Sequence, residues 1–156
     1  MKILVVYDSY FGNTEKVARA IGESFGDDVP VLRVGDVKLE QLSELDYLIV
    51  GSPTRAFRPS DATKAFLGDI PSGGLKGVKV AAFDTRIAQE DVDNPVLRFM
   101  VRLFDYAARP TADKLVKRGG ELVGEPMGFM VMDSEGPLRE GELERAVSWA
   151  QKLVAF

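Results

Sequence analysis

The sequence predicts an α/β fold, in which helices cover both faces of a parallel β-sheet. Short apolar runs alternate along the chain with stretches whose apolar residues recur at helical spacing, and this alternation is typical of parallel strands joined by helical crossovers. The apolar runs are continuous, as expected for strands buried on both faces. Because 156 residues suit one domain, we expect residues 1–156 to form a single domain.

The first half of the chain supplies three predicted strands and two predicted helices. Val17, Ile21 and Phe25 share one face of the first helix. Ser60 is placed to cap the second helix, and Pro30 is typical of an edge strand. We expect strands at residues 2–7, 29–34 and 47–50, helices at residues 13–25 and 60–66, and mostly loop between the second and third strands.

The second half continues the same alternation. We expect a fourth strand at residues 78–83 and a helical region at residues 94–118 with a break at Pro110. A last strand at residues 121–123 and 128–132, bent at residues 124–126, should precede a closing helix at residues 140–154.

The charge and hydropathy of the chain exclude several classes of function. The formal net charge is -4 and the pI is about 5.0, so we expect no nucleic-acid partner. No apolar run approaches the roughly 18–20 residues of a membrane span. The apolar run at the N-terminus is too short for the core of a signal peptide. We therefore expect a cytoplasmic protein without membrane contact.

The chain contains no cysteine and no histidine. This excludes disulfides and thiolate metal sites, and it removes the commonest metal ligand and the commonest general acid or base near neutral pH. We expect no catalytic residue and no metal site, and we expect a bound cofactor to supply any chemistry.

Three polar segments, residues 8–14, 51–57 and 84–86, follow predicted strands. Ligands of doubly wound sheets lie at the carboxyl ends of the strands, so these segments should line one crevice. In the second segment Ser52 and Thr54 offer a pair of hydroxyl groups that should face the first segment.

The first segment has the properties of a phosphate site. Ser9 and Thr14 offer hydroxyls, and Asn13 offers an amide. Gly12 allows the backbone to turn, and the helix that follows adds unpaired N–H groups and the positive end of its dipole. Neither GxGxxG nor GxxxxGK[ST] occurs here. The alternative is that the polar side chains only cap a helix.

Three stretches resemble the flavodoxin family. SYFGNTEKVA resembles the phosphate loop S/T-x-T-G-N-T with its following Glu and helix, and GSPTRAF resembles the second flavin loop, with a PTR that also occurs in related quinone reductases. EGPLREGELERAVSWA resembles the last loop and helix of flavodoxin-domain proteins. The resemblance spans almost the whole chain. It implies a three-layer sandwich around a five-stranded parallel sheet of order 2-1-3-4-5.

The resemblance also implies non-covalently bound FMN. It assigns phosphate contacts to Ser9, Gly12, Asn13 and Thr14, with support from the second loop. The full set of cofactor-binding residues that we expect is Ser9, Tyr10, Phe11, Gly12, Asn13, Thr14, Ser52, Pro53, Thr54, Arg55, Ala56, Phe57, Asp84, Thr85 and Arg86.

The chain departs from the family pattern around the flavin ring. Phe11 stands where the family usually has a hydroxyl, and the third loop, FDTRIAQEDVDNP, contains no tyrosine to stack on the ring. Arg55, Arg58 and Arg86 fall in segments that should border the ring. Since positive charge stabilises a reduced, anionic flavin, we hypothesise a less negative reduction potential and two-electron transfer. The alternative is that these arginines are solvated or pair with acidic residues, namely Glu90, Asp91 or Asp93.

An insertion at residues 87–107 separates the fourth strand from a family-like helix that begins near Ala108. Its core, NPVLRFMVRLFDYA, has helical spacing and is apolar around most of its circumference. Such a helix requires cover on more than one side. It packs on its own domain, contacts a second copy of the chain, forms a wall over the flavin, or lies on a membrane surface.

We interpret the chain as an electron-transfer flavoprotein that shuttles electrons between redox partner proteins. The first alternative is an enzyme, an FMN-dependent NAD(P)H or quinone oxidoreductase, which would need an open pocket over the ring. The second alternative is a flavodoxin fold that has lost its flavin and serves as an interaction domain.

Overall fold

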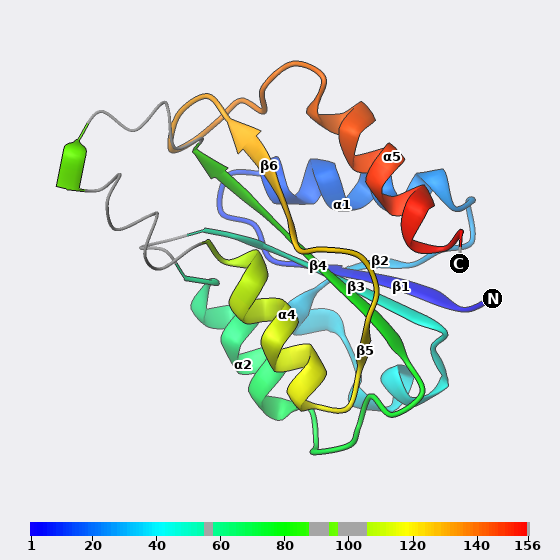
Figure 1. Cartoon of the computed structure of the whole chain (residues 1–156). Coiled ribbons are helices and arrows are strands. Elements are labelled where there is room, and N and C mark those ends of the chain that lie inside the picture. The colour runs from blue at the N-terminus through cyan, green and yellow to red at the C-terminus, as the bar shows by residue number, and fades with distance from the viewer. Residues whose placement is uncertain (55–57, 88–93, 97–105, 156) are drawn as a thin grey trace.

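A parallel β-sheet forms the centre of the computed structural model (Figure 1), which describes residues 1–54, 58–87, 94–96 and 106–155. The strands are β1 (Ile3–Tyr7), β2 (Val31–Arg33), β3 (Tyr47–Pro53), β4 (Lys79–Ile87), β5 (Glu121–Leu122) and β6 (Met127–Val131).

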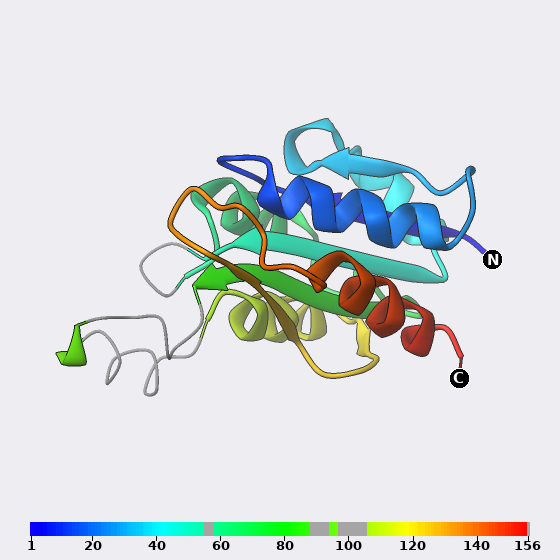
Figure 2. The same cartoon turned by 90° about the horizontal axis from the view of Figure 1, so that it is seen from above.

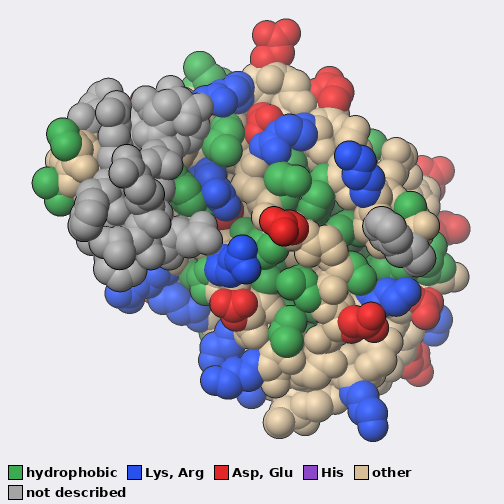
Figure 3. Space-filling model, in the orientation of Figure 1, with side chains coloured by type: hydrophobic (Ala, Val, Ile, Leu, Met, Phe, Trp, Pro, Cys, Tyr) green, Lys and Arg blue, Asp and Glu red, His purple; other side chains and the backbone are tan. Residues whose placement is uncertain are grey.

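Helices cover both faces of this sheet, which confirms the predicted three-layer sandwich (Figures 1 and 2). They are α1 (Asn13–Ser24), α2 (Asp61–Asp69), α4 (Ala108–Lys117) and α5 (Glu142–Leu153). Helices α1 and α5 share one hydrophobic core with every second residue of β1, such as Val5, while α2 and α4 share the other core with Val6. Among the helices in the described ranges, none has the length and apolar character needed to cross a membrane. Acidic and basic side chains are interspersed over the face shown in Figure 3.

The sheet has the predicted strand order, with one addition. The order is β2-β1-β3-β4-β5, and β6 also pairs with β4. The predicted bent last strand is therefore two strands, so the expected number of five strands was wrong. β5 pairs with Lys79 and Val80 at the start of β4, and β6 pairs with Phe83–Ile87 further along it. Gly124, with φ 68°, lies in the bend between them.

Strands β3 and β4 run further than the sequence predicted. Pairing between them continues to Pro53 and Thr85, and β6 extends the pairing of β4 to Ile87. Residues 51–53 and 84–86 therefore belong to strands, where we expected loops. The polar side chains at these positions gave no sign that the strands continue. Backbone pairing of β4 with β3 and β6 determines where the strands end.

The connections differ from the prediction in two places. Two 3-10 helices, η1 (Val34–Asp36) and η2 (Leu39–Glu44), occupy the expected loop between β2 and β3. Helix α4 begins at Ala108, as expected for the family-like helix, and Pro110 lies in its first turn. Proline is tolerated there because the first-turn amides have no partner within the helix, so the expected break at Pro110 was wrong. The predicted cap on α2 is confirmed, since Ser60 accepts a hydrogen bond from the Thr63 amide.

An aromatic cluster joins β4, β6 and α5 in the core beneath α1 and α5. The rings of Phe83, Phe129 and Trp149 meet edge to face, with centroids 5.9 to 6.1 Å apart. Edge-to-face pairs stabilise a core by about 0.5–1.5 kcal/mol beyond their buried area. This cluster fixes the position of β6, whose end contributes to the pocket described below.

Side chains of α5 and the loop before it cover the outer edge of β6. The Glu142 carboxylate accepts a hydrogen bond from the Met130 amide, and Arg145 donates to the Gly128 carbonyl. The Arg139 amide donates to the Met130 carbonyl at 2.8 Å. These bonds satisfy backbone groups that an edge strand would otherwise leave unpaired.

Replacing Glu142 with Gln is expected to lower the free energy of unfolding by about 2 kcal/mol at pH 7, because charged hydrogen bonds are lost at a buried site. Burial alone would raise the pKa of Glu142, but hydrogen bonds from Arg145 and then from the Met130 amide lower it below its ordinary value of 4.5. A pKa that is lower in the folded chain stabilises the fold above the unfolded pKa, and this contribution is lost as the pH falls through the folded pKa.

Urea unfolding of both proteins between pH 7 and pH 3 measures this effect. The difference between them should be largest near neutral pH and should shrink below about pH 4.5. Glu144→Gln is the matched control, since Glu144 is exposed in the same helical turn. Equal losses from both substitutions would contradict the role of Glu142.

Candidate functional site

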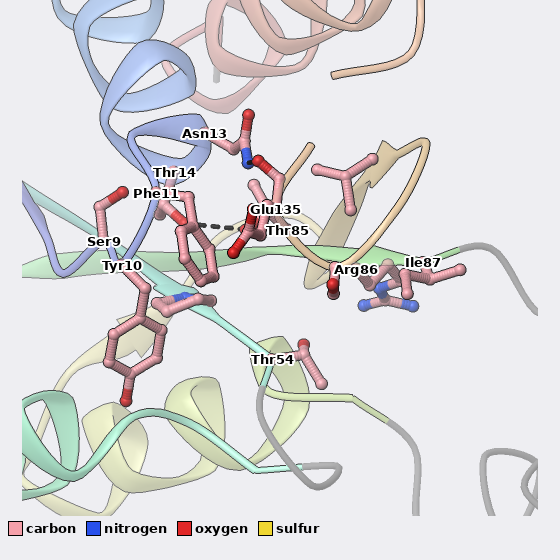
Figure 4. A pocket seen from close by; sticks show the side chains of 13 residues that line it. Ser9, Tyr10, Phe11, Asn13, Thr14, Thr54, Thr85, Arg86, Ile87 and Glu135 are labelled. Carbon is pink, nitrogen blue, oxygen red and sulfur yellow. Dashed lines mark hydrogen bonds between the residues drawn. The ribbon is translucent and has the colours of Figure 1, made fainter. Parts of the chain in front are cut away.

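A pocket of about 420 Å³ opens at the carboxyl ends of β1, β3, β4 and β6. Figure 4 shows Tyr10 and Phe11 on one side of it and Arg86 and Ile87 on the other. The residues that line it are Ser9, Tyr10, Phe11, Asn13, Thr14, Pro53, Thr54, Thr85, Arg86, Ile87, Val131, Ser134 and Glu135.

The turn that leads from β1 into α1 leaves the start of the helix open to a ligand. Gly12 has φ 90° and is the N-cap residue, and its amide donates to the Ser9 hydroxyl at 2.9 Å. No side chain caps the helix. Within the described part of the chain, nothing accepts a hydrogen bond from the amides of Asn13, Thr14 and Glu15. Free amides at a helix N-terminus form a binding site for an anion.

The polar side chains of the first helical turn connect neighbouring loops instead of capping α1. The Asn13 side-chain amide donates to the Glu135 carbonyl at 3.1 Å, and the Thr14 and Thr85 hydroxyls share a hydrogen bond of 2.8 Å. A Cβ at Gly136 would lie 2.6 Å from the Asn13 side chain, so the loop after β6 approaches α1 closely at a glycine. These contacts join the start of α1, the end of β4 and the loop after β6 into one wall of the pocket (Figure 4).

Asp84 and Arg86 of β4 form a largely buried ion pair. The Arg86 guanidinium makes two hydrogen bonds of 2.6 Å to the Asp84 carboxylate, and it stacks on the Tyr106 ring at 3.8 Å from the centroid. Asp84, which is fully buried, also accepts a hydrogen bond from the Ala108 amide at 2.8 Å. Thr54 accepts one from the Ala107 amide at 3.2 Å. Together they hold the start of α4 against the ends of β3 and β4.

This ion pair bears on the hypothesis that arginines near the flavin ring make its reduction potential less negative. Arg86 lines the pocket, but its charge is balanced by Asp84, which belongs to its own strand and not to the expected acidic residues 90–93. Those acidic residues and Arg55 lie outside the described residues. Arg58 is described and exposed.

Two aromatic side chains of the first loop border the pocket and are half exposed. Tyr10 is 45% exposed and Phe11 is 53% exposed, and their ring centroids are 6.5 Å apart. They offer apolar surface at the rim, which is typical of sites that bind organic ligands.

The structure brings together most of the residues that the sequence predicted for the site. Gly12 forms the turn without lining the pocket. Ser52 is fully buried and hydrogen bonds with the Pro53 carbonyl and the Ser60 amide, and Asp84 is directed toward Arg86 and α4. Residues 55–57 lie outside the described residues, as do residues 97–105 of the expected inserted helix.

Sequence reasoning missed four lining residues, Ile87, Val131, Ser134 and Glu135. Three of them lie at the end of β6 or just after it. The same rule that selected the ends of the other strands applies to this one, so the loop after the last strand was a signal that could have found them.

Doubly wound sheets bind their ligands where the winding reverses, and here that position carries free amides and hydroxyls. The molecule is therefore a doubly wound α/β protein with an open helix N-terminus, a feature suited to an anion, at the ligand-binding edge of its sheet. A family model described as a flavodoxin domain matches residues 4–95, and the chain belongs to the flavodoxin family.

Similar proteins agree with this placement. The chain is 30% identical to a flavodoxin of Nostoc sp. over 145 residues, which cover 90% of this chain and 79% of that protein. The structure of oxidised flavodoxin 2 from Bacillus cereus is similar with a TM-score of 0.74 and 28% identity, covering 98% of this chain and 97% of that one. A flavodoxin from the domain Archaea has the same fold, with a TM-score of 0.74 at 24% identity over 98% of this chain and 96% of that one.

Proposed function

We propose that this chain binds FMN in the pocket at the carboxyl ends of its strands and carries electrons between redox partner proteins. The observation that carries the proposal is the uncapped start of α1 behind the Gly12 turn, in a member of the flavodoxin family. We also propose that residues 1–156 form one domain, since both hydrophobic cores pack on the same sheet.

The residues present fit a phosphate-bearing ligand of this size. A volume of about 420 Å³ lies in the range of sites for small organic ligands. Ser9 uses its hydroxyl oxygen to accept the Gly12 amide, so its hydrogen is available to donate to a phosphate oxygen. Asn13 gives one side-chain hydrogen to Glu135 and keeps the other. The free amides of α1 complete the set of donors.

The bound flavin would supply the redox chemistry, accepting and giving up electrons. The role of the chain is to bind, orient and shield. Without histidine or cysteine, the chain lacks the commonest groups for moving a proton near neutral pH. The half-exposed rings of Tyr10 and Phe11 would cover part of the ligand.

Purified protein should take up FMN and keep it through gel filtration, with the visible absorbance of a flavin. Titrations with FMN and with riboflavin separate the phosphate site from the ring site. We expect FMN to bind about 100-fold more tightly than riboflavin, because charged hydrogen bonds contribute about 1.5–3 kcal/mol each. Failure to retain FMN, or equal affinities for the two flavins, would contradict the proposal.

Ser9→Ala should weaken the binding of FMN while leaving riboflavin affinity unchanged. Ser43→Ala is the matched control, because Ser43 is exposed in η2 and hydrogen bonds only locally, with Glu40.

Steady-state oxidation of NAD(P)H with a quinone acceptor separates an electron carrier from a reductase. A carrier is reduced by a partner protein and should show no turnover in this assay.

A further inference from the structure

Arg33 on the edge strand β2 contacts the first loop of the pocket from outside. One guanidinium nitrogen lies 3.2 Å from a carboxylate oxygen of Asp8 and 3.0 Å from the Ser9 carbonyl. The other lies 3.9 Å from the Glu15 carboxylate, and the guanidinium stands over the Tyr7 ring, 5.2 Å from its centroid. A single side chain thus meets several groups at the end of β1 and the start of α1.

The negative charge of Asp8 lies next to the pocket, so its contacts with Arg33 affect the binding of an anionic ligand. Asp8 is 7% exposed, and its amide is held by the Gly51 carbonyl at 3.1 Å, so its carboxylate has little freedom to move into solvent. The next residue, Ser9, lines the pocket. A carboxylate next to the pocket repels an anionic ligand unless an opposite charge compensates.

We infer that Arg33 is a positioning residue for phosphate binding, whose charge compensates Asp8 so that the loop at residues 8–14 can accept an anion. The inference rests on the proposed function. Through its hydrogen bond to the Ser9 carbonyl, Arg33 also fixes the backbone of the residue that donates to the phosphate. Arg33 itself does not line the pocket, and it acts through Asp8 and Ser9.

The test must separate this role from a contribution to stability. The Arg33 side chain is 43% exposed, but the Asp8 side chain is only 10% exposed, so removing Arg33 leaves a largely buried carboxylate without the guanidinium and also lowers the free energy of unfolding. A loss of stability alone would weaken the binding of every flavin. A positioning role shows instead as a loss of affinity for an anionic ligand that a neutral ligand does not share.

The test is the affinity of purified apoprotein for FMN and riboflavin, measured by quenching of flavin fluorescence at low and high salt. Arg33→Gln should bind FMN about tenfold more weakly at low salt, with a smaller loss at high salt because salt screens charge. Its affinity for riboflavin, which lacks the phosphate, should be unchanged. Arg33→Lys should recover most of the loss.

Asp8→Asn combined with Arg33→Gln should restore FMN affinity, because the charge that needed compensation is gone. Lys2→Gln is the control for net charge, since Lys2 lies next to the opposite end of β1 with its side chain 66% exposed. The control should bind FMN as the wild type does.

Three outcomes would overturn the inference while leaving the proposed function intact. They are an unchanged FMN affinity in Arg33→Gln, an equal loss for riboflavin, and a double variant as weak as Arg33→Gln. If the wild-type protein binds no FMN at all, the proposed function itself is wrong and the inference falls with it.

Discussion

Replacing Gly51 with Val is expected to lower the free energy of unfolding by about 3 kcal/mol or more. Gly51 lies in β3 and is paired with Tyr7 on one side and Phe83 on the other. A Cβ at this position would lie 2.0 Å from the Phe83 ring, a separation that real atoms do not adopt. Gly51→Ala should cost less than Val, about 2 kcal/mol, because it adds one methyl group.

Neither partner in this clash can move away easily. Hydrogen bonding to β1 and β4 holds the backbone of Gly51 on both sides. The Phe83 ring is fully buried and packs edge to face with Phe129 and Trp149. The close packing of protein interiors leaves no empty space to accept the displaced ring.

Urea unfolding at pH 7 measures the loss for Gly51→Ala and Gly51→Val. The control is Gly68→Ala in α2, where an added Cβ meets nothing within 4 Å. That substitution should stabilise the protein by about 0.5–1 kcal/mol, since alanine is the better helix former. A Gly51→Val variant as stable as the wild type would refute the argument.

A double-mutant cycle attributes the loss to the ring. If Phe83 causes the clash, Gly51→Ala should cost less in a Phe83→Leu background, because leucine is smaller than the aromatic ring. Additive costs would show that the glycine is required for another reason.

Local rules predicted the parts of the fold that depend on neighbouring residues. The continuous apolar runs predicted where the strands lie along the chain, and Ser60 caps α2 as expected. Gly12, with φ 90°, makes the turn that its position before a helix suggested. These features could be predicted because a few adjacent residues determine them.

Contacts between distant segments could not be predicted in the same way. The Asn13 side chain bonds to Glu135, which is 122 positions away, and only the folded sheet brings the loop after β6 beside α1.

The ion pair of Asp84 with Arg86 is a local contact and a different case. Residues i and i+2 of a strand share one face, so this pair was available to sequence reasoning and was missed because β4 was expected to end at residue 83.

Asp84→Asn, the second substitution with a large expected effect, should lower the free energy of unfolding by about 3 kcal/mol. The Arg86 side chain is only 16% exposed, so losing its partner leaves a largely buried charge without compensation. The side-chain oxygen of the asparagine can still accept a hydrogen bond from the Ala108 amide. Its NH₂ group would then face the guanidinium, and two hydrogen-bond donors cannot bond to each other. The start of α4 should loosen as a result.

Arg86→Met should cost a similar amount, since it leaves the buried carboxylate of Asp84 without the guanidinium. The combination of Asp84→Asn with Arg86→Met should be more stable than either single variant, because neither buried charge remains. Urea unfolding of the four proteins measures this, and a double variant that loses the sum of the single losses would contradict the ion-pair argument.

Asp84→Asn also tests whether the ion pair of Asp84 and Arg86 affects the reduction potential of a bound flavin. Arg86 lines the pocket, and removing the carboxylate of Asp84 leaves its positive charge unbalanced there. If FMN binds as proposed, its reduction potential in Asp84→Asn should become less negative than in the wild type, because positive charge favours the reduced, anionic form. An unchanged potential beside the expected loss of stability would mean that the pair only anchors α4. A shift in potential would mean that Asp84 holds the potential down in the wild type by neutralising the arginine beside the pocket.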